Sequence, residues 1–493
     1  MPDVVIALAK TWLKRAAIAA ALVLLTILAV RAFDAWRAPP LSLWHREVPR
    51  ELDADAIDVA DWGAWLAAES QAFDDVRTRV TDKLPAAERV AANRFFVGSP
   101  MNASRRAFDW NRTYVLMPEG PPRGAVVLLH GLTDSPYSLR HIASHYRARG
   151  FVAVGMRMPG HGTVPAGLTR ARWEDWVAAT RLAVRHAHSL AGKNAPLHLV
   201  GYSNGGALAL EYSLEALDDP GLATPDQLVL ISPMVGITSF ARFAGVLGWP
   251  AVFPGFAKAA WLETVPEYNP FKYNSFPVNA ARQSSQLVDA VQDKLLRRVG
   301  DNELTRFPRV LAFQSALDAT VFTSALVDSL FALLPENGSE LVLFDRNRSA
   351  DAGPLVRPES DAPLLAMTNP VKRAYGITIV GAAESGSVAR HLAAGESRFV
   401  DATLTQAYPR DMYSLSHVAL PFPMSDGLYG TKPDAAEDFG VRLGTVAVRG
   451  ERGALVVGAD TLMRASCNPF FDYLLERIDG TLKVAGMGTF PLF

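Results

Sequence analysis

Short apolar runs alternate with amphipathic stretches over much of the chain. The amphipathic stretches include residues 173–190 and 205–216, where the spacing of apolar residues is helical. Continuous apolar runs of this length are typical of strands buried on both faces of a sheet. The alternation therefore predicts an α/β fold with a mostly parallel sheet and helices on both faces. The predicted strands lie at 113–120, 125–131, 151–157, 197–203, 227–233, 309–315 and 340–346.

Two long segments interrupt this alternation. Residues 236–300 are too long for one crossover helix, and their first part is rich in aromatic residues, so we predict an insertion there. Residues 347–405 form a second predicted insertion with one strand, YGITIVG. GTVAVRGERGALVVG predicts a hairpin further on, and Asn468-Pro469 predicts the start of a last helix that ends at Gly480. The predicted organisation has seven parts. They are an anchor and its flank (1–40), an N-terminal extension (41–112), a core (113–235), a first insertion (236–300), a second part of the core (301–346), a second insertion (347–405), and a C-terminal part (406–493) with a histidine loop, hairpin and helix.

The N-terminal region contains an apolar run between Arg15 and Arg31. As a helix the run spans about 22 Å, which is short of the roughly 30 Å hydrocarbon core. Counted from Trp12 to Trp36, with the arginines reaching outward, the segment becomes long enough to span. A cleaved signal peptide and a buried helix are the alternatives, although no small-residue cleavage site follows the run. We expect an uncleaved single-pass anchor.

The charges beside the run slightly favour one orientation. Lys10, Lys14 and Arg15 precede it, whereas Asp34 lies between the two arginines that follow it. This bias favours a cytoplasmic N-terminus and a body on the extracytoplasmic side, which is the periplasm in a Gram-negative bacterium.

Charge and cysteine content exclude several functions. The 49 basic and 50 acidic residues give a net charge of -1, which supplies no electrostatic reason to bind nucleic acid. Cys467 is the only cysteine, so an intramolecular disulfide or a cysteine-ligated metal cluster cannot form. We expect neither a cofactor nor a metal ion, and the oligomeric state stays open.

The pentapeptide Gly201-Tyr202-Ser203-Asn204-Gly205 joins a predicted strand to a predicted helix. A G-x-S-x-G sequence in this setting places the serine on a sharp turn at the carboxyl edge of the sheet. Glycines flank such a serine because the strained turn and the close packing of helix on strand leave no room for Cβ atoms. Ser203 is therefore the candidate nucleophile, and a passive serine in a glycine-rich turn is the alternative.

Further motifs resemble the α/β-hydrolase superfamily, and more narrowly its serine-aminopeptidase, monoacylglycerol-lipase and carboxylesterase branch. The resemblance covers roughly 113–345 and the segment around residue 417. It implies the α/β-hydrolase fold, with residues 236–300 as a cap over the active site. It implies that His161 belongs to the fold and is not catalytic. The motifs are LLHGLTDSP (128–136), MPGHGTVPAGL (158–168), WEDW (173–176), GYSNGG (201–206), ALDATV (316–321) and SLSHVALPF (414–422).

The oxyanion hole is expected from backbone N–H groups. In serine hydrolases of this topology, one donor lies in the loop after the strand that ends in His-Gly, and the other follows the nucleophile. The corresponding donors are Leu132 and Asn204. His130 is expected to brace this loop.

A general base and an acid must follow the serine in the order Ser, Asp, His. Asp318 follows a predicted strand and is the candidate acid; Asp328 falls in a helical pattern and Asp345 ends a strand run. His417 matches the base motif of the branch, whereas His391 lies in a helix-like stretch and is interpreted as a surface residue. Asp318 and His417 are unusually far apart in sequence, so residues 347–405 must loop out and return His417 to the site.

These features predict a membrane-anchored serine hydrolase. The expected substrate is a small hydrophobic ester or acylglycerol, because the aromatic cap and the anchor both favour apolar substrates. A serine peptidase or an acyltransferase on the same fold is the first alternative. An inactive, membrane-tethered binding module is the second.

Overall fold

The computed structural model describes the chain except residues 1, 38–39, 237–253, 302, 352–354, 356, 358–360, 369–371, 384–385, 447–454 and 483–493. Its central feature is a ten-stranded sheet in the order β1-β3-β2-β4-β5-β8-β9-β10-β11-β12. Neighbouring strands from β3 to β10 in this order are parallel, and β1, β11 and β12 pair antiparallel at the two edges. The expectation of a mostly parallel α/β sheet is confirmed.

Every strand predicted from the apolar runs is present. These strands are β1 (Tyr114–Leu116), β2 (Gly124–Leu129), β3 (Phe151–Met156), β4 (Leu197–Tyr202), β5 (Gln227–Ile231), β8 (Arg309–Ser315) and β9 (Glu340–Phe344). The remaining sheet strands are β10 (Gly376–Ala383), β11 (Gly386–Leu392) and β12 (Val400–Leu404), and a separate pair consists of β6 (Trp261–Glu263) and β7 (Phe276–Pro277).

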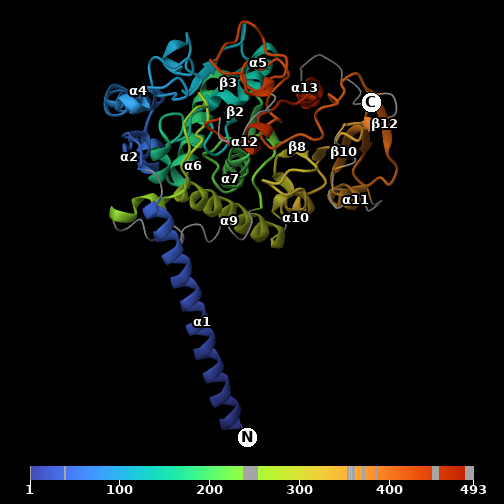
Figure 1. Cartoon of the computed structure of the whole chain (residues 1–493). Coiled ribbons are helices and arrows are strands. Elements are labelled where there is room, and N and C mark those ends of the chain that lie inside the picture. The colour runs from blue at the N-terminus through green and yellow to red at the C-terminus, as the bar shows by residue number, and fades with distance from the viewer. Residues whose placement is uncertain are drawn as a thin grey trace.

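Helices cover both faces of the sheet (Figure 1). Side chains of β2 show why both faces are apolar: Val127 and Leu129 belong to one buried cluster, while Val126 and Leu128 belong to another. The first cluster includes α6 and α7, and the second includes α5 and α13. The described helices are α1 (Pro2–Arg37), α2 (Leu43–Arg46), α3 (Ala54–Val59), α4 (Trp62–Arg79), α5 (Arg140–Ala148), α6 (Trp173–Ala191), α7 (Asn204–Asp218), α9 (Val278–Gly300), α10 (Thr323–Ser329), α11 (Ala362–Thr368), α12 (Ala459–Met463) and α13 (Phe471–Asp479).

The second insertion extends the sheet. β10 is the strand predicted from YGITIVG and pairs in parallel with β9, with Ile377 opposite Leu341. β11 and β12 then continue the sheet as antiparallel strands. His391 therefore lies in a strand, and the helix-like interpretation of its stretch is wrong, because pairing with β10 and β12 overrides the local pattern.

The last helix begins later than predicted. α13 starts at Phe471, and Phe470 occupies the cap position expected for Asn468. The Asn468 side chain instead accepts a hydrogen bond from the N–H of Phe470 and donates one to the carbonyl of Leu420. It thereby connects the start of the helix to the loop that follows His417. The helix ends before Gly480, as predicted.

Two predicted features lie partly outside the described residues. The start of the aromatic stretch of the predicted cap falls in 237–253, and the centre of the predicted hairpin falls in 447–454. Within the predicted cap, α9 packs on α7, and Leu287 and Val291 of α9 belong to the buried cluster on that face of the sheet. The last part of the predicted cap is thus a helix of the core layer.

The N-terminal extension packs against the core through a buried charge network. The guanidinium of Arg157, at the end of β3, donates to Glu51 at 2.9 Å and to Glu69 at 2.9 Å. Both carboxylates come from the extension, and the Arg157 side chain is fully buried. Glu69 also accepts a hydrogen bond from Thr113 just before β1. The extension is therefore part of the folded unit.

Helix α1 projects from the body as a single long helix (Figure 1). Its segment Lys10–Val30 has 21 residues with a mean hydropathy of 2.1 and is not buried in the protein. At 1.5 Å per residue this segment reaches roughly 30 Å, which matches a hydrocarbon core. The helix is long and apolar enough to span a membrane, and a signal sequence would have the same properties.

Candidate active site

Ser203 lies on a strained turn between β4 and α7. Its backbone has φ 55° and ψ −117°, a conformation that non-glycine residues rarely adopt. The Ser203 N–H donates to the carbonyl of Ile231 at 2.9 Å, and its own carbonyl accepts from Met234 at 3.0 Å. Neighbouring β5 therefore holds the turn in place. The strand–turn–helix arrangement predicted for the G-x-S-x-G sequence is present.

The glycines around Ser203 are required by close backbone contacts. A Cβ atom on Gly205 would lie 1.9 Å from the carbonyl oxygen of Leu129, and one on Gly201 would lie 2.4 Å from the carbonyl oxygen of Gly205. Both atoms belong to backbone, so neither contact can be relieved by a side-chain movement. The α7 helix can approach the sheet at Ser203 only because these two positions lack side chains.

The loop after β2 lies directly against Ser203. A Cβ atom on Gly131 would be 3.2 Å from the Cβ of Ser203. In the described part of the chain, the N–H groups of Leu132 and Asn204 have no hydrogen-bond acceptor. Thr133, which follows Leu132, has a positive φ of 64°. Two unpaired N–H groups flanking a serine are the arrangement that an oxyanion hole requires.

Asp318 and His417 meet although they are 99 residues apart. His417 Nδ1 lies 2.7 Å from Asp318 Oδ2, and both side chains are buried. The other Asp318 oxygen accepts from the N–H groups of Thr320 and Val321. Burial raises the pKa of Asp318, but His417 and these N–H groups outweigh it and hold the pKa below its ordinary value. The carboxylate is therefore charged at neutral pH and orients the imidazole.

His417 also packs beside the strand that carries Ser203. The Tyr202 hydroxyl donates to the His417 carbonyl at 3.3 Å, and the two rings are 5.5 Å apart. Since Tyr202 precedes Ser203, this contact places the histidine loop at the same edge of the sheet as the serine.

The competing acids and histidine have other partners or positions. Asp345 pairs with Arg348 at 2.9 Å, and Asp328 lies within α10. His391 contacts Thr378 at 2.9 Å and Glu340 at 3.5 Å, near the start of β10, and its side chain is mostly covered. His391 is thus not the surface residue that the sequence pattern suggested.

Asn347 closes the second insertion at its base. Its N–H donates to the carbonyl of Tyr413 at 2.8 Å, and its side-chain amide donates to Pro409 at 3.0 Å and Met412 at 2.9 Å. Tyr408 additionally donates to the carbonyl of Asp345 at 2.7 Å. After β9 the chain therefore forms the strands β10, β11 and β12, and residues 409–413 then lie beside Asn347 again. This return brings His417 back to Asp318, and no sequence motif marked Asn347 for this role.

α9 contributes a residue that sequence reasoning missed. The Ser284 hydroxyl of α9 donates to the side-chain oxygen of Asn204 at 2.7 Å. Asn204 is one of the two expected oxyanion donors, and this bond to its side chain means that α9 helps to hold the residue. His130 braces the same region as expected, since one ring nitrogen contacts the carbonyl of Gly131 at 2.9 Å and the other accepts from the N–H of Met158. Burial lowers the pKa of His130 to about 4, so its ring is neutral.

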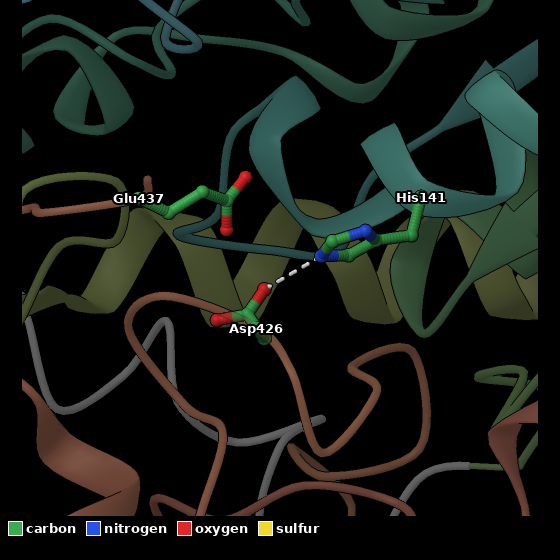
Figure 2. Close-up of side chains that lie close together, drawn as sticks. All are labelled: His141, Asp426 and Glu437. Carbon is green, nitrogen blue, oxygen red and sulfur yellow. Dashed lines mark hydrogen bonds and ion pairs between the residues drawn. The ribbon is translucent and has the colours of Figure 1, made fainter. Parts of the chain in front are cut away.

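His141, Asp426 and Glu437 lie close enough together to hold a metal ion (Figure 2). Arg140 already bonds both carboxylates, at 2.7 Å to Asp426 and at 2.6 Å to Glu437. Asp426 further accepts from the Tyr137 hydroxyl at 3.0 Å. A cation at this position would be repelled by the guanidinium, so we interpret the cluster as a charge network that connects α5 to the segment after His417.

Part of the chain is similar to known proteins. Residues 120–306 match the family described as serine aminopeptidase, S33. The chain is 28% identical over 151 residues to a thermostable monoacylglycerol lipase of Bacillus sp. (strain H-257), an alignment that covers 30% of this chain and 58% of the lipase.

Solved structures of lipolytic enzymes are also similar. A monoglyceride lipase from Saccharomyces cerevisiae is 14% identical with a TM-score of 0.38, over 47% of this chain and 82% of that chain. A structure from work on the metagenome-derived lipolytic enzymes LipS and LipT is 20% identical with a TM-score of 0.37, over 48% of this chain and 89% of that chain. Taken together with the sheet order and the turn at Ser203, the family match places the core of this chain in the α/β-hydrolase superfamily.

Proposed function

We propose that the chain is a serine hydrolase that cleaves carboxylic esters through Ser203, His417 and Asp318. The observation that carries the proposal is the buried 2.7 Å contact between His417 and Asp318, beside the strained turn that presents Ser203. A histidine held by a carboxylate has the tautomer needed to accept a proton from a serine hydroxyl. The match to a monoacylglycerol lipase supports an ester or acylglycerol substrate.

The proposed reaction has two halves. Ser203 Oγ attacks the ester carbonyl while His417 Nε2 takes its proton, and the N–H groups of Leu132 and Asn204 stabilise the oxyanion. His417 then protonates the leaving alcohol, which leaves an acyl-enzyme on Ser203. Water attacks the acyl-enzyme with His417 again as base, and releases the acid. Asp318 stays charged throughout and stabilises the imidazolium.

Labelling with a fluorophosphonate tests the nucleophile and the base together. We expect one adduct per chain by intact mass, lost in Ser203→Ala and at least a hundredfold slower in His417→Ala, because general-base catalysis contributes about 10²–10⁴-fold. His391→Ala is the matched control, and its labelling rate should equal that of the unchanged chain. Loss of labelling in His391→Ala alone would identify the other histidine as the base. Absence of any adduct on the folded chain would favour the binding module.

Substrate panels separate the proposed esterase from its alternatives on the same fold. We expect turnover of 4-nitrophenyl esters and monoacylglycerols to exceed that of aminoacyl 4-nitroanilides. The reverse preference would favour a peptidase, in line with the name of the matched family. Transfer of the acyl group to an added alcohol in preference to water would favour an acyltransferase.

We propose that α1 anchors the enzyme in a membrane with its body on the extracytoplasmic side. Support comes from the apolar Lys10–Val30 segment, which is not buried in the protein. The full chain should sediment with membranes and resist extraction by alkaline carbonate, and an added protease should reach the body only from the extracytoplasmic side. An N-terminal sequence starting after Val30 would show a cleaved signal instead.

Asn347→Ala should impair the proposed activity as well as stability. The substitution removes the side-chain hydrogen bonds that hold the base of the insertion, which should lower the free energy of unfolding by about 1–3 kcal/mol. It should also make the loop that carries His417 less well held. Asn337→Ala is the matched control, since Asn337 makes comparable bonds to Phe307 and Ser339 at the start of β9. Urea unfolding should shift in both variants, whereas kcat should fall only in Asn347→Ala. Equal kcat values in the two variants would contradict this role.

A further inference from the structure

The segment around Lys272 lies along the loop that flanks Ser203. The Tyr273 N–H donates to the carbonyl of Thr133 at 2.7 Å, and the ring of Phe271 stacks on Tyr137 at 3.9 Å. Lys272 lies between these two contacts, next to the loop that contains Leu132. Its backbone N–H is bonded to Asn269, which fixes the position of the residue.

The bonds of Lys272 in the described part of the chain involve its backbone, and its ammonium group has no hydrogen bond and no ion pair there. The side chain is partly buried. Burial lowers the pKa of Lys272, the Asp134 carboxylate opposes that effect, and Arg464 adds to it. A partly buried lysine without a partner is an open site for an anion.

Arg464 contacts the segments that carry the proposed acid and base. Its guanidinium donates to the Thr320 hydroxyl at 2.7 Å, and the Thr320 N–H donates to Asp318. The Arg464 carbonyl accepts a hydrogen bond from Ser416, the residue before His417. Arg464 is therefore held at the rim beside both the proposed acid and the proposed base, and its side chain is exposed.

The charges around the two cations leave room for one more negative charge. Asp134 is buried next to the same loop, and burial raises its pKa to about 6, partly offset by Lys272. The Asp318 carboxylate is committed to His417 and two N–H groups. Asp134 can balance one of the two cations, and the other cation remains available to a ligand.

We infer that Lys272 and Arg464 bind a singly charged anionic group, such as a carboxylate, on the ester substrate. The inference rests on the proposed function and names its substrate class: an ester whose acyl or alcohol part carries a negative charge. Lys272 supplies a point charge beside the oxyanion loop, and Arg464 supplies planar donors at the rim.

Matched substrates test this selectivity. Mono-4-nitrophenyl adipate and 4-nitrophenyl hexanoate differ only in a terminal carboxylate on the acyl side, and hexanoyl esters of 4-hydroxybenzoate and phenol place it on the alcohol side. We expect kcat/KM to favour the charged member of at least one pair, and Lys272→Met or Arg464→Met to reduce that ratio on the order of tenfold. Using the ratio cancels differences in intrinsic reactivity between variants. Lys193→Met and Arg410→Gln remove exposed cations elsewhere and should leave it unchanged.

A binding measurement separates this inference from the proposed chemistry. Calorimetry on the Ser203→Ala chain should show monomethyl adipate binding more tightly than methyl hexanoate, with that advantage lost in Lys272→Met and Arg464→Met. A labelled, active enzyme without any preference for charge would overturn the inference and leave the proposed function standing. Charge-dependent binding by a chain that fails to label would overturn the esterase and retain the anion site.

Discussion

We expect His417→Ala to lower kcat/KM for ester hydrolysis by about 10⁴-fold or more, and Asp318→Ala combined with it to lower kcat/KM little further. The reason is that the proposed Ser203, His417 and Asp318 act as a unit, so removing one member removes most of what the others contribute. Asp318→Asn alone should cost about 10⁴-fold, because an amide favours the wrong imidazole tautomer. Steady-state kinetics with 4-nitrophenyl hexanoate measure each variant.

Unfolding measurements show whether a variant loses activity because it fails to fold. The buried contact between His417 and Asp318 also holds the returning loop, so each variant must first show a cooperative urea transition. His186→Ala is a suitable control. His186 lies on α6, far along the chain from the histidine loop, and its ring stacks on Trp62 at 3.9 Å. Two results would contradict the proposed triad. One is a loss of kcat/KM in the His417→Ala, Asp318→Ala double variant that equals the product of the two single losses. The other is a kcat/KM of His417→Ala within tenfold of that of the unchanged chain.

Arg140→Met destabilises the fold by about 3–5 kcal/mol. The guanidinium is buried and bonds Asp426, which is fully buried, so its removal takes away the arginine charge that balances this carboxylate. Arg149→Met is the matched control at the end of the same helix: Arg149 pairs with Asp479, and its side chain is 44% exposed, so its loss should cost less than about 1 kcal/mol. Urea unfolding at pH 7 measures both.

The pH dependence of the same variants checks the electrostatic cause. Burial raises the pKa of Asp426, but Arg140 and His141 outweigh it and hold the pKa below its ordinary value. The stabilisation is therefore fully present above the ordinary carboxyl pKa of about 4, and is lost as the pH falls through the lower folded value. The difference in the free energy of unfolding between the unchanged chain and Arg140→Met should be smaller at pH 3 than at pH 7. Adding Asp426→Asn to Arg140→Met should recover part of the stability, and no recovery would argue against an uncompensated charge.

The elements nearest Ser203 were predictable because their patterns are local. A strand buried on both faces needs an uninterrupted apolar run, and each such run from β1 to β9 is a strand of the sheet. The glycines at 201 and 205 were predictable from the motif around Ser203. The contact that excludes a Cβ at Gly201 lies within the turn, whereas the one at Gly205 comes from Leu129 of β2. Asp318 could be selected over Asp328 because it follows a strand directly.

The second insertion shows where local patterns fail. The segment containing His391 resembles a helix when read alone, but pairing on both sides makes it the strand β11. Asn468 looks like a helix cap, yet its side chain serves the histidine loop through Leu420. In both cases hydrogen bonds to distant segments outweigh a propensity that is worth less than about 1 kcal/mol per residue.

The sequence by itself determined which segments form the sheet strands up to β9, the turn at Ser203 and the residue types proposed for catalysis. The order of these strands in the sheet came from the tertiary structure. Only the tertiary structure decided that Asn347 closes the insertion, that His417 therefore reaches Asp318, and that Lys272 and Arg464 approach the same site. The physical reason is the sequence separation of the contacts, because the pattern of a strand or a turn is set by residues that are neighbours in the chain. The meeting of residues 99 positions apart depends on the hydrogen bonds that fold everything between them.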